Sequence, residues 1–486
     1  MTEAIGRRAA HGTAWLGLVN MLSKGSQVLV TLALGSYLSR AELGSVTIAV
    51  VLVNLGQTLQ SMGVYDVISR TTHEVRAFTG TVATLSLLMA AGASVMLFAA
   101  GGPIAELVGA PSAAWPIRIT GLSLPFTAYA GVQMAYLHRR LDFRRRLIPD
   151  AGSALAGAAV TIGSAALGAG SWSLVAGILT TAVLAPLFGI LVGVRIPLRW
   201  NRSHRHETVT WIRVVGPAAV LGVLLLNIDY VVVTRSLGEE ANGLYSYAYR
   251  FAFVPYIMIA VVLSGVAFPV YTRVVERDRL SGAPVPGSLL TAAFTRVLHA
   301  LLAATAGLYV LLALLAPRIV VIDARWGPSA PVLTVLCGYG LLLGLVLAGY
   351  DALRAIGRPE VYLRAQATHV VLLLGLAILM VRRSGIIGVA WAQLIAAALV
   401  TGGVAVALAR VGVLNAGCAR VLRGPAAAAA VTVAVFAGMN GARLLPPDDS
   451  LPGLLALGLG LAACYTVTLA AVDRGAVREL RHLAGR

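Results

Sequence analysis

Charged side chains are scarce in this chain of 486 residues. They make up 12% of it, whereas hydrophobic residues make up 58%. Soluble domains carry about 25% charged residues, and a water-soluble protein of this length could not bury so much apolar side chain. The mean hydropathy is +0.84, and apolar runs recur along the whole length. The sequence therefore predicts an all-α integral membrane protein with many transmembrane helices.

Cysteine and lysine are rare as well. The three cysteines, Cys337, Cys418 and Cys464, lie in or beside apolar segments and share no short spacing. They fit neither a disulfide framework nor a zinc site, and we expect small buried side chains without a bound metal. Lys24 is the only lysine, so the other 37 of the 38 basic residues are arginines.

Several signatures of enzymes are missing from the sequence. It contains no GxxxxGK[ST] phosphate-binding loop, because Lys24 stands in the order Ser-Lys-Gly. No constellation of His, Asp and Ser stands out, and no outer loop is long enough for the catalytic face of a membrane glycosyltransferase or polymerase. We therefore expect no ATP hydrolysis by that route, no catalytic residue and no enzymatic step.

Membrane-spanning helices need about 20 mainly apolar residues each. The apolar runs of this chain predict fourteen such helices. Their expected ranges are residues 13–38, 44–66, 79–101, 116–137, 147–169, 172–194, 212–237, 243–270, 290–316, 329–352, 361–381, 385–409, 425–444 and 451–472. The connections between them are too short for a soluble domain of any size.

The positions of the arginines test this topology independently. With the amino terminus inside, the cytoplasmic segments hold 28 arginines and the outer segments hold 8, while Arg250 lies within a span. A bias that alternates loop by loop is what the positive-inside rule requires. We therefore place both termini in the cytoplasm. The net charge of +18 is then explained by topology and attraction to the inner leaflet, without nucleic acid as a partner.

The long inner loop at residues 195–213 divides the chain into two halves. The run LSRAELGSVTIA at 38–49 is weakly similar to RSLGEEANGLYSYA at 235–248, which supports an internal repeat. We expect one six-helix bundle over residues 1–206, a second over 207–424, and two additional helices with a cytoplasmic tail over 425–486. Two pseudo-symmetric bundles are typical of transporters with a central cavity between the halves.

Polar residues at membrane depth are candidates for function, because they are costly to place there. Lys24 lies about 16 Å from the start of the first span, near its middle, and Gln27 is beside it. Asn54 and Gln57 are three residues apart in the second span, which places them on one helix face. We expect these four side chains to line a hydrated substrate cavity, and hydrogen bonding between helices is the alternative.

Three later residues are further candidates for this cavity. Asp229 and Arg250 are expected at similar depth on neighbouring antiparallel spans, either as a mutual salt bridge or as cavity-lining residues. Tyr245, which lies between them in sequence, is assigned to the outer aromatic belt. His369 lies deep in its span and could titrate near neutral pH, with a packed, hydrogen-bonded histidine as the alternative.

Other basic residues are expected at the inner membrane surface. The run RRLDFRRR at residues 139–146 is predicted to hold anionic head groups. Arg296, Arg354 and Arg364 are interpreted as interfacial residues whose long side chains extend to the head groups.

Four runs of the sequence resemble one family of membrane transporters. They are YLSRAELGSVTIAVVLVNLGQTLQSMGVYDVISR at 37–70, YLHRRLDFRRR at 136–146, NIDYVVVTRSLGEEANGLYSYAYRFAFVP at 227–255 and VAFPVYTRV at 266–274. Their order, together with the fourteen-span layout, resembles the polysaccharide exporters, or O-antigen flippases. These form a branch of the multidrug/oligosaccharidyl-lipid/polysaccharide superfamily, to which the MATE transporters also belong.

The resemblance implies a flippase in the plasma (inner) membrane of a bacterium. Such a protein moves oligosaccharide repeat units, linked to undecaprenyl diphosphate, from the inner to the outer leaflet for the synthesis of cell-surface polysaccharide. The implied mechanism is alternating access around a cationic central cavity. In this chain Lys24 and Arg250 would offset the diphosphate charge, while Asn54, Gln57 and Gln133 would replace water around the sugar hydroxyls.

The resemblance also implies partners. Besides the lipid-linked oligosaccharide and membrane lipids, a polysaccharide polymerase and glycosyltransferases are expected to act beside a monomeric transporter. No cofactor is expected, and H+ or Na+ as a coupling ion is left open.

Two other functions are left open by the residues. A cation-coupled drug exporter of the MATE type is expected to use acidic residues in its spans; Asp229 fits that expectation, whereas Lys24 in the first span does not. A scaffold that recruits polysaccharide enzymes through its basic loops would need no transport. Substitution of Lys24 separates the three, because a flippase would lose polymer export, a drug exporter would change toxin resistance, and a scaffold would retain export.

Overall fold

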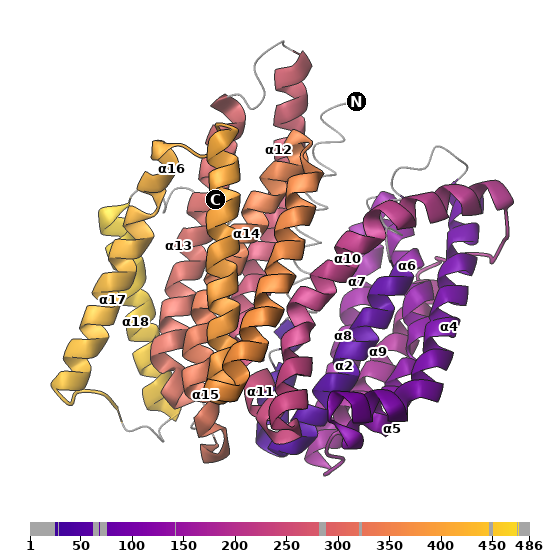
Figure 1. Cartoon of the computed structure of the whole chain (residues 1–486), viewed down its shortest axis with the longest axis horizontal. Coiled ribbons are helices and arrows are strands. Elements are labelled where there is room, and N and C mark those ends of the chain that lie inside the picture. Colours follow the sequence, from indigo (N-terminus) through magenta and orange to yellow (C-terminus); the bar gives the residue numbers. More distant parts are fainter. Residues whose placement is uncertain are drawn as a thin grey trace. The chain divides into compact units, whose positions relative to one another are not determined.

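The computed structural model describes residues 25–27, 29–61, 68, 75–140, 142–280, 288–319, 323–446, 451–473 and 475. Within these residues the chain forms helices and turns, and none of them belongs to a strand (Figure 1). The predicted all-α class is therefore confirmed. In lipid, helices satisfy each backbone N–H and C=O within the same segment, which explains why apolar runs of this length become helices.

The chain divides into two compact units, residues 1–247 and 248–486. The elements of the first unit are α2 (Arg40–Ser61), α4 (Val75–Val108), η1 (Pro111–Ala113), α5 (Ala114–Gly121), α6 (Leu124–Arg139), α7 (Phe143–Leu147), η2 (Ile148–Gly152), α8 (Ser153–Ala166), α9 (Trp172–Leu191), α10 (Arg202–Leu237) and the start of α11 (Glu239–Pro255). Those of the second unit are the rest of α11, η3 (Tyr256–Ala260), α12 (Val261–Leu280), α13 (Ser288–Ile319), η5 (Ala324–Ser329), α14 (Ala330–Ile356), α15 (Pro359–Arg410), α16 (Ala416–Val421), α17 (Arg423–Gly441) and α18 (Leu451–Val472). The boundaries predicted after residues 206 and 424 concern functional bundles and stay predictions.

Ten helical stretches in the described part of the chain are long and apolar enough to cross a membrane. They cover the predicted spans except the first, fourth and fifth, with the eleventh and twelfth joined in α15. About half of the first span lies outside the described residues, and its described residues 25–27 and 29–37 are helical. The fourth is divided into α5 and α6 near Pro125, which lacks the N–H that a continuous helix would use. The fifth is interrupted by the π-helical turn η2, which contains Pro149. The total of fourteen stays a prediction.

The helix α15 joins two predicted spans through one residue. It contains 52 residues, and Gly385, with φ 61° and ψ −144°, is the position where the chain departs from helical geometry. A positive φ is readily adopted by glycine, whereas a residue with a Cβ would be strained there. The loop expected between the two spans is therefore reduced to a single turning residue.

In the first unit, α2 and α11 cross closely at two glycines. A Cβ on Gly44 would lie 1.8 Å from the backbone oxygen of Glu239, and a Cβ on Gly243 would lie 1.9 Å from the backbone oxygen of Arg40. The amide of Asn242 reinforces the crossing by donating to the backbone oxygen of Gly44 at 2.8 Å. Small residues at helix crossings allow the backbones to approach, as is common in membrane proteins.

In the second unit, α14 is a central helix that contacts α12, α13 and α15. Buried residues of these helices, among them Tyr271, Phe294 and Leu353, form one apolar cluster. This packing brings the inner-side ends predicted for α12, α14 and α15 into one neighbourhood, which becomes important below.

The last two helices, α17 and α18, contact α13 (Figure 1). The hydroxyl of Tyr465 donates to the backbone oxygen of Ala303 at 3.2 Å, and its ring lies where a side chain on Gly307 would be. At the end of α18, Asp473 Oδ2 lies 2.7 Å from Nε2 of His299. Polar and shape-specific contacts thus attach the two additional helices to α13.

Candidate functional site

The predicted cavity residues of the first two spans are only partly described. Lys24 lies outside the described residues, and Gln27 is exposed on a helical segment. Asn54 and Gln57 are half-buried on α2 and lie one turn apart. Among the described residues, neither amide side chain forms a hydrogen bond. Their shared helix face fits the predicted polar stripe, while their contact with a substrate stays a prediction.

The side chain of Gln133 is fully buried in α6. Its Nε2 donates to the backbone oxygen of Val194 at 2.9 Å and to that of Pro186 at 3.3 Å. Gly189 makes room for it, because a Cβ there would lie 2.3 Å from the amide oxygen. These contacts favour a role for Gln133 in holding the end of α9 to α6 over contact with sugar hydroxyls.

Asp229 is fully buried in α10 and accepts a hydrogen bond from the hydroxyl of Tyr245 on α11 at 2.7 Å. The Tyr245 ring also meets the ring of Tyr230 edge to face, with centroids 5.8 Å apart. The assignment of Tyr245 to the outer aromatic belt is wrong, because its side chain is completely buried. Sequence reasoning missed this partner because a tyrosine in an apolar run is equally compatible with a belt and with an interior hydrogen bond.

Arg250 is half-buried on α11 and belongs to the second unit, whereas Asp229 belongs to the first. The salt bridge between them stays a prediction. The contact described for Asp229 is the hydrogen bond from Tyr245, which lies in the same unit.

His369 is fully buried in α15, as its predicted depth requires. Within the described part of the chain, neither of its ring nitrogens has a hydrogen-bond partner. Gln366 lies one turn earlier on the same helix, and its Oε1 also has no partner there. The alternative prediction, a packed histidine with hydrogen bonds, therefore does not describe His369 within these residues. Both His369 and Gln366 are buried on α15 with polar atoms that no described residue binds.

A second polar group lies on α14, at Arg354, which the sequence analysis assigned to the membrane interface. Asp351 on α14 is fully buried and accepts hydrogen bonds from Ser264 on α12 and from the guanidinium of Arg354. The Arg354 guanidinium carbon lies 4.8 Å from the ring centroid of Phe268 and 5.4 Å from that of Tyr362. The three-residue spacing of Asp351 and Arg354 in an apolar helix was the signal that could have found this group.

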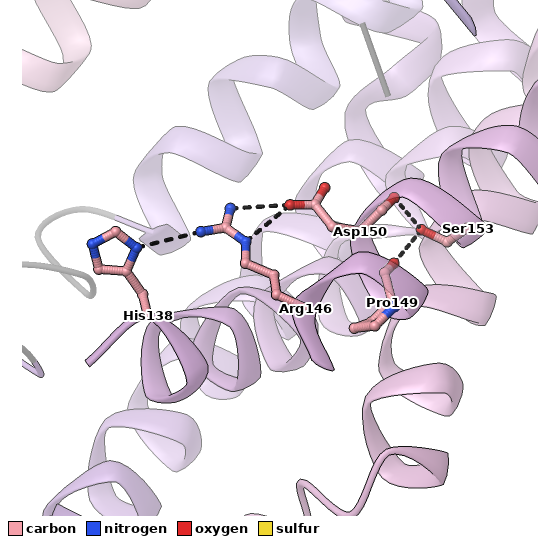
Figure 2. Close-up of polar contacts among 5 residues, drawn as sticks. All are labelled: His138, Arg146, Pro149, Asp150 and Ser153. Atoms are coloured by element: carbon pink, nitrogen blue, oxygen red, sulfur yellow. Dashed lines mark hydrogen bonds and ion pairs between the residues drawn. The ribbon is translucent and has the colours of Figure 1, made fainter. Parts of the chain in front are cut away.

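The basic run at the end of α6 is held by a partly buried network (Figure 2). Nε and Nη2 of Arg146 each lie 3.0 Å from Oδ2 of Asp150, and Nη1 lies 3.4 Å from Nδ1 of His138. The Ser153 hydroxyl donates to the backbone oxygens of Pro149 at 2.6 Å and Asp150 at 3.2 Å. Burial and the neighbouring Arg146 guanidinium lower the pKa of the His138 imidazole below its usual value.

Three other arginines of the run are accessible, whereas Arg139 is half-buried and donates to the backbone oxygen of Ile68. Arg140, Arg144 and Arg145 are exposed, while the Arg146 side chain is 15% exposed. Three exposed guanidinium groups on a fixed turn are suited to bind anionic head groups, as the run RRLDFRRR predicted. Arg146 has a different role, because it fixes the turn.

Comparison with protein families identifies relatives of this chain. The profile of one family, described as polysaccharide biosynthesis protein, matches residues 34–322. The chain is 28% identical over 341 residues to the succinoglycan biosynthesis transport protein ExoT of Rhizobium meliloti (strain 1021), covering 69% of this chain and 67% of that protein. It is 21% identical over 359 residues to the lipopolysaccharide biosynthesis protein WzxC of Escherichia coli (strain K12), covering 72% and 68%.

The fold is also shared with a solved structure. The lipid II flippase MurJ, in an inward closed conformation, superposes with a TM-score of 0.72 and 15% sequence identity, over 96% of this chain and 100% of that one. At this identity the likeness establishes a common fold.

Proposed function

The chain belongs to the polysaccharide biosynthesis protein family, and on this premise we propose that it is a flippase for lipid-linked oligosaccharide repeat units. The observation that carries the proposal is the family match over residues 34–322, on a chain whose described helices include ten able to cross a membrane. It is a multi-pass membrane transporter and not an enzyme. Relatives named for the transport of succinoglycan and the synthesis of lipopolysaccharide support a polysaccharide precursor as substrate.

The physical task of such a protein is to carry a charged and strongly hydrated head group through hydrocarbon. Cationic side chains in a low-dielectric passage offset the charge of a diphosphate. Lys24 and Arg250 are the residues we assign to that charge. The amides of Asn54 and Gln57, for which the described residues offer no hydrogen-bond partner, replace water around sugar hydroxyls, while the prenyl tail stays in lipid.

The finer parts of the proposal follow from the arginine distribution and from the chemistry of the substrate. The carrier lipid is undecaprenyl diphosphate, and the direction is from the inner to the outer leaflet of a bacterial plasma membrane with both termini of the protein inside. Glycosyltransferases supply the substrate and a polymerase consumes it. The transporter acts as a monomer through alternating access, and H+ or Na+ is the candidate coupling ion.

Genetic complementation tests this function. A strain that lacks the chain is complemented with the wild type, Lys24→Ala or Arg250→Ala, and with Arg383→Ala as a control that removes an exposed arginine of α15. We expect the deletion to abolish surface polysaccharide and to accumulate the lipid-linked precursor. The wild type and the control should restore export, whereas Lys24→Ala and Arg250→Ala should restore little although they reach normal levels in the membrane.

Each part of the proposal can be contradicted by a different result. Normal polysaccharide in the deletion strain would overturn the function. Normal polysaccharide in both cavity variants would overturn the assignment of Lys24 and Arg250. A change in toxin resistance without any change in polysaccharide would identify a drug exporter instead.

A further inference from the structure

Arg354 is held in place by three helices of the second unit. It lies in the last turn of α14, and its guanidinium is close to the ring of Phe268 from α12 and the ring of Tyr362 from α15. Arginine groups stack on aromatic faces, and such contacts restrict a side chain that would otherwise sample many rotamers. The orientation of this guanidinium is therefore fixed before any ligand arrives.

Asp351 anchors one edge of the guanidinium. Its carboxylate is fully buried and is bound on one oxygen by Nη2 of Arg354 and on the other by the Ser264 hydroxyl. A carboxylate in this position is held by two donors, so it cannot turn away from the arginine. The pair thus differs from a surface salt bridge, in which both partners move freely.

The opposite edge of the guanidinium remains accessible. The side chain of Arg354 is 38% exposed, although Asp351 is 0% exposed. A guanidinium has five N–H donors, and within the described part of the chain Asp351 is its one hydrogen-bond acceptor. Several N–H donors of the Arg354 guanidinium therefore have no acceptor among the described residues, although the group is already oriented. A guanidinium in this state can bind two phosphate oxygens at once.

Unused polar atoms lie beside this fork. Tyr350 meets Tyr362 edge to face, with ring centroids 4.8 Å apart. The buried hydroxyl of Tyr350 has no hydrogen-bond partner among the described residues, and neither has Oε1 of the buried Gln366. Buried polar groups without partners are rare in folded proteins and call for a ligand or water.

The surroundings of this site carry an excess of positive charge. Exposed arginines are found at the same ends of α12, α14 and α15, namely Arg273, Arg277, Arg358 and Arg364. The exposed acidic residues on these ends are Glu276 and Glu360. Such a distribution attracts anions toward the fork.

We propose that Arg354 binds the diphosphate of the lipid-linked substrate at a subsite on the inner side of the second unit. This inference rests on the proposed flippase function and adds a binding residue to it, separate from Lys24 and Arg250. The fixed guanidinium fork takes two oxygens of the diphosphate, and the Tyr350 hydroxyl and the Gln366 amide oxygen serve a neighbouring sugar or a bound water. Asp351 acts through Arg354 and is a positioning residue.

Purified protein in a non-ionic detergent provides the test. The probes are farnesyl diphosphate, farnesyl monophosphate, farnesol and phosphatidylglycerol, and binding is measured by isothermal titration calorimetry. The variants are Arg354→Ala, Arg354→Lys and, as a control, Arg410→Ala, which removes an exposed arginine at the end of α15. Charged hydrogen bonds of this kind correspond to an affinity change of about 10- to 100-fold.

We expect Arg354→Ala to bind farnesyl diphosphate at least about 10-fold more weakly than the wild type, with farnesol binding unchanged. Arg354→Lys keeps the charge and loses the fork, so it should lower the ratio of diphosphate to monophosphate affinity. A role limited to joining helices would not change that ratio. Arg410→Ala should behave as the wild type. If Arg354→Ala does not purify as a folded protein, the affinity ratio of Arg354→Lys decides the question.

Three outcomes would overturn the assignment. Wild-type affinity of both Arg354 variants for farnesyl diphosphate would remove Arg354 from the site. An equal loss of affinity for phosphatidylglycerol would identify a phospholipid head-group site rather than a substrate subsite. If the wild type itself fails to bind farnesyl diphosphate, the failure extends to the proposed flippase function, whereas the first two outcomes leave that function standing.

Discussion

The hydrogen bond from Tyr245 to Asp229 should be one of the strongest single polar contributions to the stability of the first unit. Both side chains are 0% exposed, and the phenol oxygen lies 2.7 Å from Oδ2 of the carboxyl group. A hydrogen bond to a charged group contributes about 1.5–3 kcal/mol. Tyr245→Phe keeps the ring in place and removes the donor, so it should lower the free energy of unfolding by about 2 kcal/mol.

A double-mutant cycle separates this contact from general packing effects. In an Asp229→Leu background this hydrogen bond is already lost, so Tyr245→Phe should then cost less than in the wild type, by about the 2 kcal/mol assigned to the bond. The measurement is reversible unfolding in mixed micelles with increasing SDS, followed by tryptophan fluorescence. Tyr37→Phe serves as the control, because Tyr37 is 53% exposed. Equal costs of Tyr245→Phe in the two backgrounds would refute the reasoning.

Three further predictions concern other parts of the structure. Gly44→Ala places a Cβ 1.8 Å from a backbone oxygen of α11, so it should lower the free energy of unfolding by about 1–3 kcal/mol or more. Gly92→Ala is the control, because its Cβ would have nothing within 4 Å, and it should leave the yield of folded protein unchanged. His299→Ala removes the 2.7 Å contact with Asp473 and should lower the melting temperature in detergent by about 2–4 °C; an unchanged melting temperature would contradict this role of the contact. For His138, the pKa in the folded protein lies below the usual 6.5. On acidification the unfolded chain therefore takes up a proton at a higher pH than the folded protein does. The free energy of unfolding is thus highest above about pH 6.5 and falls below that pH. His138→Gln should reduce this loss of melting temperature between pH 7 and pH 5, and an unchanged pH profile would contradict the assignment.

The helical architecture was readable from the sequence because apolar runs of membrane length can satisfy their backbone groups only as helices. The details within the spans were less accessible. Hydropathy treats Pro125 and Pro149 as interruptions of no consequence, although each lies at a break in a helix. Gly385 was expected near a loop, yet its positive φ lets two spans follow each other without one.

The sequence predicted which polar residues are buried, but it did not predict which of them contact each other. Depth in a span identified Asp229 and His369 as buried, because burial follows from the length of the apolar run on either side. It could not show that Tyr245 is the hydrogen-bond partner of Asp229, since that depends on the crossing of α10 and α11. Arg354 was assigned to the interface by its position near the end of a span. Its contacts with rings from two other helices depend on tertiary packing, which periodicity within one helix does not reveal.

The single turning residue in α15 has a practical consequence for mapping membrane topology. Gly385 joins two long helical segments, so this connection offers no slack for a protease site, an epitope or a reporter enzyme. An insertion beside Gly385 would force the two helical segments apart. An inactive reporter fusion at this position would therefore not indicate on which side of the bilayer Gly385 lies. A mirror-image residue such as D-alanine, introduced by chemical ligation, would fit the same backbone angles, because a positive φ is favourable for D residues.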